Sequence, residues 1–219
     1  RFHSIRSIPL SKPEGFWKVL WFTHSIVLID YERSVFFVDP RTGEEKARFS
    51  DDRRFERVAV SPKGKQLLFS VEEAEERVEY FDLDSPEVER CFSHPEERAN
   101  RLAFSDDGRR FAISWWDHCI VFDALSCEKI GRFHSRSTLF RTISFSPDLE
   151  TVATTREGQG IEIISLEKGL VSMIREEMGD VGGLALSPKG DRLATSSEDG
   201  LLRLWSLPEG RELSRQFLE

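Results

Sequence analysis

Two pairs of residues have the side chains that commonly bind zinc, and such binding depends on histidine and cysteine at short spacing. His118 and Cys119 are neighbours, and neighbouring residues on a strand point to opposite faces and do not share one ion. Cys91 and His94 lie three residues apart across the end of an expected strand and supply only two ligands. The sequence therefore predicts no metal site.

Glycine-rich and acidic stretches are the next candidates for chemistry. Gly158-Gln159-Gly160 and residues 179–183 look like phosphate-binding loops, but neither opens a helix whose amino terminus would hold a phosphate. Asp106-Asp107-Gly108 lacks the further oxygen ligands of a calcium loop and is better explained as a turn. We find no catalytic grouping, so we predict no catalytic residues, no cofactor and no enzymatic activity in this chain.

The pair Trp115-Trp116 has the best case for a functional role. Adjacent residues on a strand face opposite ways, so at most one of the two rings enters a given packed layer. The default interpretation is that both rings belong to the core. The alternative is that one ring lies at a loop rim and anchors a partner, since interface hot spots are enriched in tryptophan, tyrosine and arginine.

A recurring turn positions all of these residues. It begins at Ser61, Ser105, Ser146 and Ser187, at intervals of 44, 41 and 41 residues. Each turn separates two short apolar runs, which is typical of a β-hairpin, and two further runs follow each hairpin. The runs are apolar at consecutive positions, which indicates burial on both faces. Four strands per repeat of about 40 residues indicate sheets stacked as blades.

Five such units are expected in one continuous array, residues 1–219. The first unit lacks the serine turn but keeps the period, because Asp39 and Asp82, which end the third strands, lie 43 residues apart. The expected blades cover approximately residues 15–50, 55–93, 99–134, 140–175 and 181–219, after a preceding tail and linker at 1–14.

The unit from Leu184 to Ser206 resembles a WD40 repeat of the β-propeller family along its whole length. The segments that begin at Arg57, Arg101 and Arg141 resemble it more weakly. The resemblance implies an all-β fold, a WD40-like propeller with about five four-stranded antiparallel blades.

The same resemblance raises the question of completeness. Because WD40 propellers generally close with about seven blades, we interpret the chain as an incomplete part of a larger propeller. Arg1-Phe2-His3-Ser4 repeats Arg132-Phe133-His134-Ser135, so the chain is expected to start at the tail of a blade. Missing blades or another chain are expected to cover the two terminal faces.

In that family a histidine, a strand hydroxyl, an aspartate and a tryptophan form a hydrogen-bonded set within a blade. The resemblance implies these structural roles for Ser196 or Ser197, Asp199, Trp205, His94 and His134. We expect the indole N–H of Trp205 to have a partner, because a buried donor left unpaired costs about 1–3 kcal/mol.

The resemblance also implies that the loops on one face bind partners. The residues expected on this face are Trp116, His118, Arg98, Arg136 and Arg156. The leading hypothesis is a noncatalytic scaffold that mediates protein–protein interaction through these loops. The alternative is a regulatory or substrate-filtering propeller domain of a larger enzyme, such as a kinase or peptidase, whose catalytic domain lies outside this segment.

Composition limits the class of partner. The net charge of −8 would repel nucleic acid phosphates, so we expect protein partners and no nucleic acid. No apolar stretch approaches the roughly 20 residues that cross a bilayer, so we expect no membrane association. Cys91, Cys119 and Cys127 cannot all pair with one another, which favours a reducing compartment and a cytoplasmic location.

Overall fold

The chain forms β-strands throughout the part that the structure describes. The computed structural model describes residues 16–21, 26–30, 34–50, 55–62, 65–71, 77–82, 90–93, 98–116, 118–133, 142–156, 160–175 and 180–217. Within these ranges there are twenty strands and no helix, and therefore no helix long and apolar enough to cross a membrane. The predicted all-β class is confirmed.

The strands form five four-stranded antiparallel sheets, here called blades 1 to 5. Blade 1 contains β1 (Phe16–Trp21), β2 (Ile26–Asp30), β3 (Ser34–Val38) and β4 (Glu45–Ser50). Blade 2 contains β5 (Phe55–Val60), β6 (Gln66–Val71), β7 (Arg77–Asp82) and β8 (Arg90–Ser93). Blade 3 contains β9 (Arg101–Phe104), β10 (Arg110–Ser114), β11 (Cys119–Asp123) and β12 (Lys129–Phe133). Blade 4 contains β13 (Ile143–Phe145), β14 (Thr151–Arg156), β15 (Gly160–Ser165) and β16 (Gly169–Ile174). Blade 5 contains β17 (Val181–Leu186), β18 (Arg192–Ser197), β19 (Leu201–Ser206) and β20 (Arg211–Phe217).

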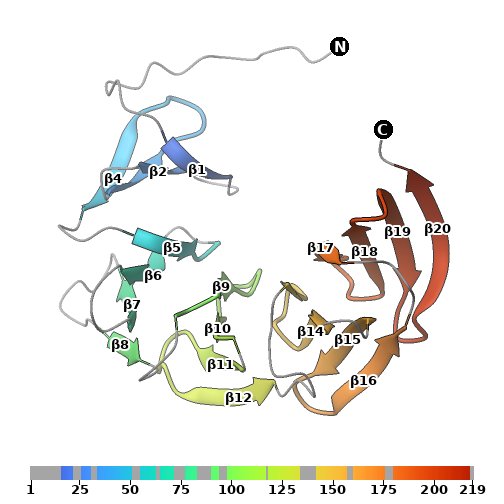
Figure 1. The fold of residues 1–219 in the computed structure, drawn as a ribbon. Coiled ribbons are helices and arrows are strands. Elements are labelled where there is room, and N and C mark those ends of the chain that lie inside the picture. Colours follow the sequence, from blue (N-terminus) through green and yellow to red (C-terminus); the bar gives the residue numbers. More distant parts are fainter. Residues whose placement is uncertain are drawn as a thin grey trace.

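The blades follow one another around an open arc (Figure 1). Strands β5, β9 and β17 lie on the inner side of the arc, and β8, β12 and β20 lie on its outer side. Blades 1 and 5 stand at the two ends of the arc, and each blade is made of four strands consecutive in sequence. The arrangement is that of propeller blades, as the repeat predicted.

The recurring serine has a local hydrogen-bonding role that explains its period. The Oγ atoms of Ser61, Ser105, Ser146 and Ser187 each accept a hydrogen bond from the backbone N–H five residues later, at 2.9 to 3.1 Å. This bond closes the turn between the first and second strands of blades 2 to 5. The serine turn is therefore a structural device, repeated once per blade.

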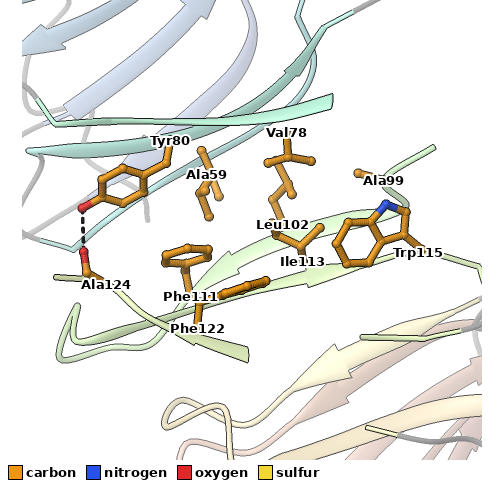
Figure 2. Close-up of a cluster of buried hydrophobic side chains, with 11 residues drawn as sticks. Ala59, Val78, Tyr80, Ala99, Leu102, Phe111, Ile113, Trp115, Phe122 and Ala124 are labelled. Carbon is orange, nitrogen blue, oxygen red and sulfur yellow. Dashed lines mark hydrogen bonds between the residues drawn. The ribbon is translucent and has the colours of Figure 1, made fainter. Parts of the chain in front are cut away.

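Apolar side chains fill the layers between successive blades. In the layer between blades 2 and 3, Phe111 is fully buried and stacks on Phe122 with ring centroids 5.0 Å apart. The hydroxyl of Tyr80 in blade 2 donates to the carbonyl of Ala124 in blade 3 at 2.8 Å, as Figure 2 shows. Each such layer joins two blades into a continuous core, so the position of every edge loop depends on its neighbouring blade.

Candidate functional site

The arc has two edges that differ in their connections. One edge, here called the serine-turn edge, carries the serine turns and the turns between the third and fourth strands. Backbone bonds join these turns, for example from Ala124 N to Arg109 O and from Leu166 N to Glu150 O, both at 2.8 Å. The opposite edge, here called the loop edge, carries the connections from the second to the third strand and the connections between blades. Of the predicted binding residues, Arg98, Trp116, His118 and the backbone of Arg156 lie at or close to the loop edge.

The tryptophan pair at the end of β10 splits between core and surface. Trp115 is buried beside Ala99 in the cluster between blades 2 and 3 (Figure 2), whereas Trp116 is 42% exposed. Asn100 N donates to Ser114 O at 2.7 Å, which holds the segment entering β9 against the segment leaving β10. The opposite orientation of adjacent residues thus leaves one ring at the loop edge, and the interpretation that both are core does not hold.

Two hydrogen bonds fasten this part of the loop edge across the boundary between blades 2 and 3. An Nη1 of Arg98 donates to Oε1 of Glu56 at 3.0 Å, although the Arg98 side chain is 60% exposed. Nε of Arg57 donates to the carbonyl of Asn100 at 3.2 Å. Trp116 therefore lies next to the segment that connects blades 2 and 3, and hydrogen bonds hold this segment to both blades.

One predicted member of the binding face is misplaced. His118 is buried, and its ring stacks on Trp115 with centroids 4.7 Å apart. Trp115 N donates to His118 O at 2.8 Å, so the loop reverses direction tightly. This tight turn brings the imidazole against the indole. The prediction that His118 lies on the exposed face is wrong. Arg136 lies outside the described residues, and only the backbone of Arg156 is described, at the end of β14.

The expected partner of Trp205 exists, and it is Thr195, which was not among the residues predicted from the sequence. The buried indole Nε1 donates to Oγ1 of Thr195 at 3.1 Å, rather than to Ser196 or Ser197. Trp205 pairs with Leu193 in the register of β18 and β19, so Thr195 lies two residues along on the same face and Ser196 on the other. Strict alternation from Leu193 would have identified Thr195.

A second set of hydrogen-bonded side chains in blade 5 surrounds a buried arginine, Arg203. Ser197 Oγ donates to Oδ1 of Asp199 at 2.6 Å, and Arg203 donates to both Ser197 and Asp199. The hydrogen bond from Arg203, followed by that from Ser197, holds the pKa of Asp199 well below its usual range. His94 and His134, the expected histidines of earlier blades, lie outside the described residues.

The bond between Trp205 and Thr195 is testable by a double-mutant cycle. Trp205→Phe and Thr195→Val each leave one buried polar group unpaired, and each is expected to lower the free energy of unfolding by about 1–3 kcal/mol. The double variant removes both groups and should lose less than the sum of the single losses. Urea unfolding measures all four proteins. Strictly additive losses would show that the two side chains do not interact.

Titratable groups of the described residues do not gather into a metal site. No cluster of three or more histidine, cysteine or acidic side chains able to hold an ion occurs there. Cys119 is buried between blades 3 and 4, and burial raises the pKa of its thiol. At neutral pH this thiol is protonated, so Cys119 packs as a small apolar side chain.

Comparison with known proteins agrees with this architecture. Residues 171–206, which run from β16 through β19, match the family described as WD domain, G-beta repeat. The COMPASS component SWD3 of Saccharomyces cerevisiae is 28% identical to this chain over 116 residues, which are 52% of this chain and 36% of the relative. The chain thus covers only a minor part of the length of that relative. Residues 171–206 thus resemble a WD40 repeat, and the five four-stranded blades have the arrangement of a WD40-like β-propeller.

Proposed function

We propose that this chain is a noncatalytic protein-interaction scaffold that holds a partner at the loop edge of blades 2 and 3, around Trp116. The observation that carries the proposal is the 42% exposure of Trp116 beside a connection fastened to both blades. A large ring held by rigid strands loses little conformational freedom on binding, so its apolar surface contributes fully to affinity.

Arg98 supports the same location. Its guanidinium is largely exposed but already oriented by Glu56, and arginine joins tryptophan among the residue types enriched at hot spots. An arginine that is held in place by an existing ion pair can donate a further hydrogen bond to a partner. Little side-chain entropy is lost on binding, because the guanidinium is already oriented. Trp116 would provide the apolar anchor, and Arg98 a polar contact at its rim.

The matched WD40 repeat and the yeast relative support an assembly role. That relative is named as a component of COMPASS, and we extend this to the proposal that the present chain is also a subunit of a multi-protein assembly. The cytoplasmic location stays a prediction.

The test of this proposal places a photo-crosslinking amino acid at position 116 or, as a control, at position 125. Leu125 belongs to the same blade and is 88% exposed, but it lies in the turn between β11 and β12 at the serine-turn edge. We expect a discrete crosslinked protein from position 116 that position 125 does not give.

The affinity of that protein is then measured by calorimetry for Trp116→Ala and Leu125→Ala. Loss of a hot-spot tryptophan should weaken binding by about 30-fold or more, which corresponds to about 2 kcal/mol, while the control binds like the parent chain. Equal affinities of the two variants would reject the loop edge around Trp116 as the binding surface.

A further inference from the structure

Two arginines on the inner strands of blades 2 and 3 give the loop edge around Trp116 a positive charge. Arg57 lies near the start of β5, Arg101 begins β9, and both side chains are exposed. Strands β5 and β9 are neighbours on the inner side of the arc (Figure 1). In the register of blade 3, Arg101 lies opposite Ser114, two residues before Trp116. The two guanidinium groups therefore belong to the same part of the loop edge as Trp116.

The guanidinium of Arg57 is oriented, but no described carboxylate neutralises its charge. Its Nε donates to the carbonyl of Asn100 at 3.2 Å and its Nη1 to the carbonyl of Glu56 at 3.0 Å, so both partners are backbone oxygens. The carboxylate of Glu56 instead accepts a hydrogen bond from Arg98. Arg57 is therefore held in position like Arg98, but its full positive charge remains available to a partner.

Arg101 contributes a second charge of the same kind. Its side chain forms no hydrogen bond or ion pair within the part of the chain that the structure describes. The other described glutamate near this part of the edge, Glu79, is buried and paired with Arg77 at 3.1 Å. Positive charge is therefore in excess among the described residues of the loop edge in blades 2 and 3, although the whole chain has a net charge of −8.

The fold itself does not require an arginine at this place in a blade. Arg57 and Arg101 occupy the same register position, opposite the serine near the end of the second strand. The residue at this position is Thr142 in blade 4 and Gly183 in blade 5. Those blades form the same four-stranded sheet with neutral residues. The arginines of blades 2 and 3 are therefore available for a role outside the fold.

The charge of the loop edge changes sign towards blade 5. Asp180, which precedes β17, and Glu198 and Asp199, which join β18 to β19, are exposed there. A long polyanion such as nucleic acid that followed this edge would be repelled at blade 5. A short acidic segment of a protein needs to contact only blades 2 and 3, where the charges attract it. The distribution of charge therefore favours a protein partner over a nucleic acid.

We propose that the partner bound around Trp116 presents a short acidic segment with an apolar side chain among its carboxylates. This inference rests on the function proposed above for the loop edge and adds the chemistry of the partner. The apolar side chain packs on the exposed indole, and the carboxylates pair with Arg57 and Arg101. A planar guanidinium offers two parallel N–H donors to a carboxylate, and opposite charges across an interface also speed association.

A peptide selection tests the chemistry of the partner. Random short peptides displayed on phage are selected on the whole parent chain, after peptides that bind the Trp116→Ala chain have been removed. The whole chain carries the acidic run at 72–76, which joins β6 to β7 and lies outside the described residues, so any competition from it is included. We expect the selected peptides to be rich in aspartate and glutamate around one apolar residue.

The selection distinguishes failure of this inference from failure of the proposed function. Peptides that depend on Trp116 but show no enrichment in acidic residues would overturn this inference and leave the function at the loop edge intact. The absence of any peptide that depends on Trp116 would contradict that function and this inference together.

The most enriched peptide then serves as the probe in fluorescence anisotropy. Arg101→Gln should weaken its binding about fivefold, the effect of losing one solvent-exposed charge pair, and Arg101→Lys should recover part of this loss because it keeps the charge. The matched control is Arg109→Gln, because Arg109 belongs to the same blade and is 83% exposed at the serine-turn edge. Equal affinities of the two glutamine variants would overturn the inference.

Salt dependence and competition by an oligonucleotide complete the test. Raising the salt concentration from about 0.05 M to about 0.3 M should weaken binding to the parent chain more than binding to Arg101→Gln, because salt screens exposed charges. An equal salt dependence would count against a role for Arg101. A single-stranded oligonucleotide should not displace the peptide, and displacement at physiological salt would favour nucleic acid and overturn the proposal. Circular dichroism should show Arg101→Gln folded like the parent.

Discussion

Replacing Phe111 with alanine is expected to lower the free energy of unfolding by about 3–5 kcal/mol, the range for a fully buried phenylalanine. Phe111 is completely buried between blades 2 and 3. Its ring contacts those of Tyr80, Phe92 and Phe122, with centroids 5.0 to 5.5 Å apart. The variant leaves a cavity lined by aromatic rings that cannot collapse easily, because each ring is held by its own strand.

Chemical unfolding followed by tryptophan fluorescence measures this loss, with Ile130→Ala as the matched control. Ile130 belongs to the same blade but is 45% exposed on β12, so its replacement should change stability by no more than about 0.5 kcal/mol. Similar losses for the two variants would mean that the layer between blades 2 and 3 is not packed as described. Trp115 packs in the same layer as Phe111, and Trp116 follows it in the chain. Phe111→Ala should therefore also make the position of the Trp116 ring less fixed.

Gly160→Ala is the second change with a large expected effect, a loss of about 2–5 kcal/mol. Gly160 opens β15 with φ of +103°, a backbone conformation that side-chain-bearing residues rarely adopt. A Cβ added there would lie 1.9 Å from the carbonyl oxygen of Ile174, so backbone atoms would have to move. The strained φ angle and the clash would both weaken the pairing between β15 and β16. This pairing supports the apolar layer between blades 4 and 5.

Two other glycines distinguish the cost of the positive φ angle from the cost of the close contact with the backbone. Gly169 also has positive φ, at +72°, but no atom lies within 4 Å of an added Cβ, so Gly169→Ala should lose only about 1–2 kcal/mol. Gly182 has neither restriction, and Gly182→Ala should leave the melting temperature unchanged or slightly raised. Calorimetric melting of the three variants should rank them in this order. A Gly160→Ala protein as stable as Gly169→Ala would contradict the close approach to Ile174.

Most of the fold was predictable because its signals are local. The serine Oγ bonds to a backbone N–H only five residues away, so the turn needs no distant partner and its period is visible in the sequence. Strand alternation is equally local, and it predicts that Trp115 and Trp116 point apart. The same rule, applied from Leu193, would have found Thr195 as the partner of Trp205.

The site was harder to predict because it depends on contacts between blades. Arg98 and Glu56 are 42 residues apart, and no local pattern indicates that they form an ion pair. His118 was expected on the surface because its loop belongs to the binding edge. Stacking on Trp115 instead places its ring in the interior, and loop curvature of this kind has no periodic signature.

The sequence alone therefore determined the number of blades, their strand order and the turns that close them, because hydrogen bonds and alternation act over a few residues. Tertiary structure decided which side chains are exposed on those blades. Trp116 became a surface residue and His118 a core residue only through the way whole sheets stack. Burial is a property of neighbouring blades, and those neighbours are supplied by residues about 40 positions away.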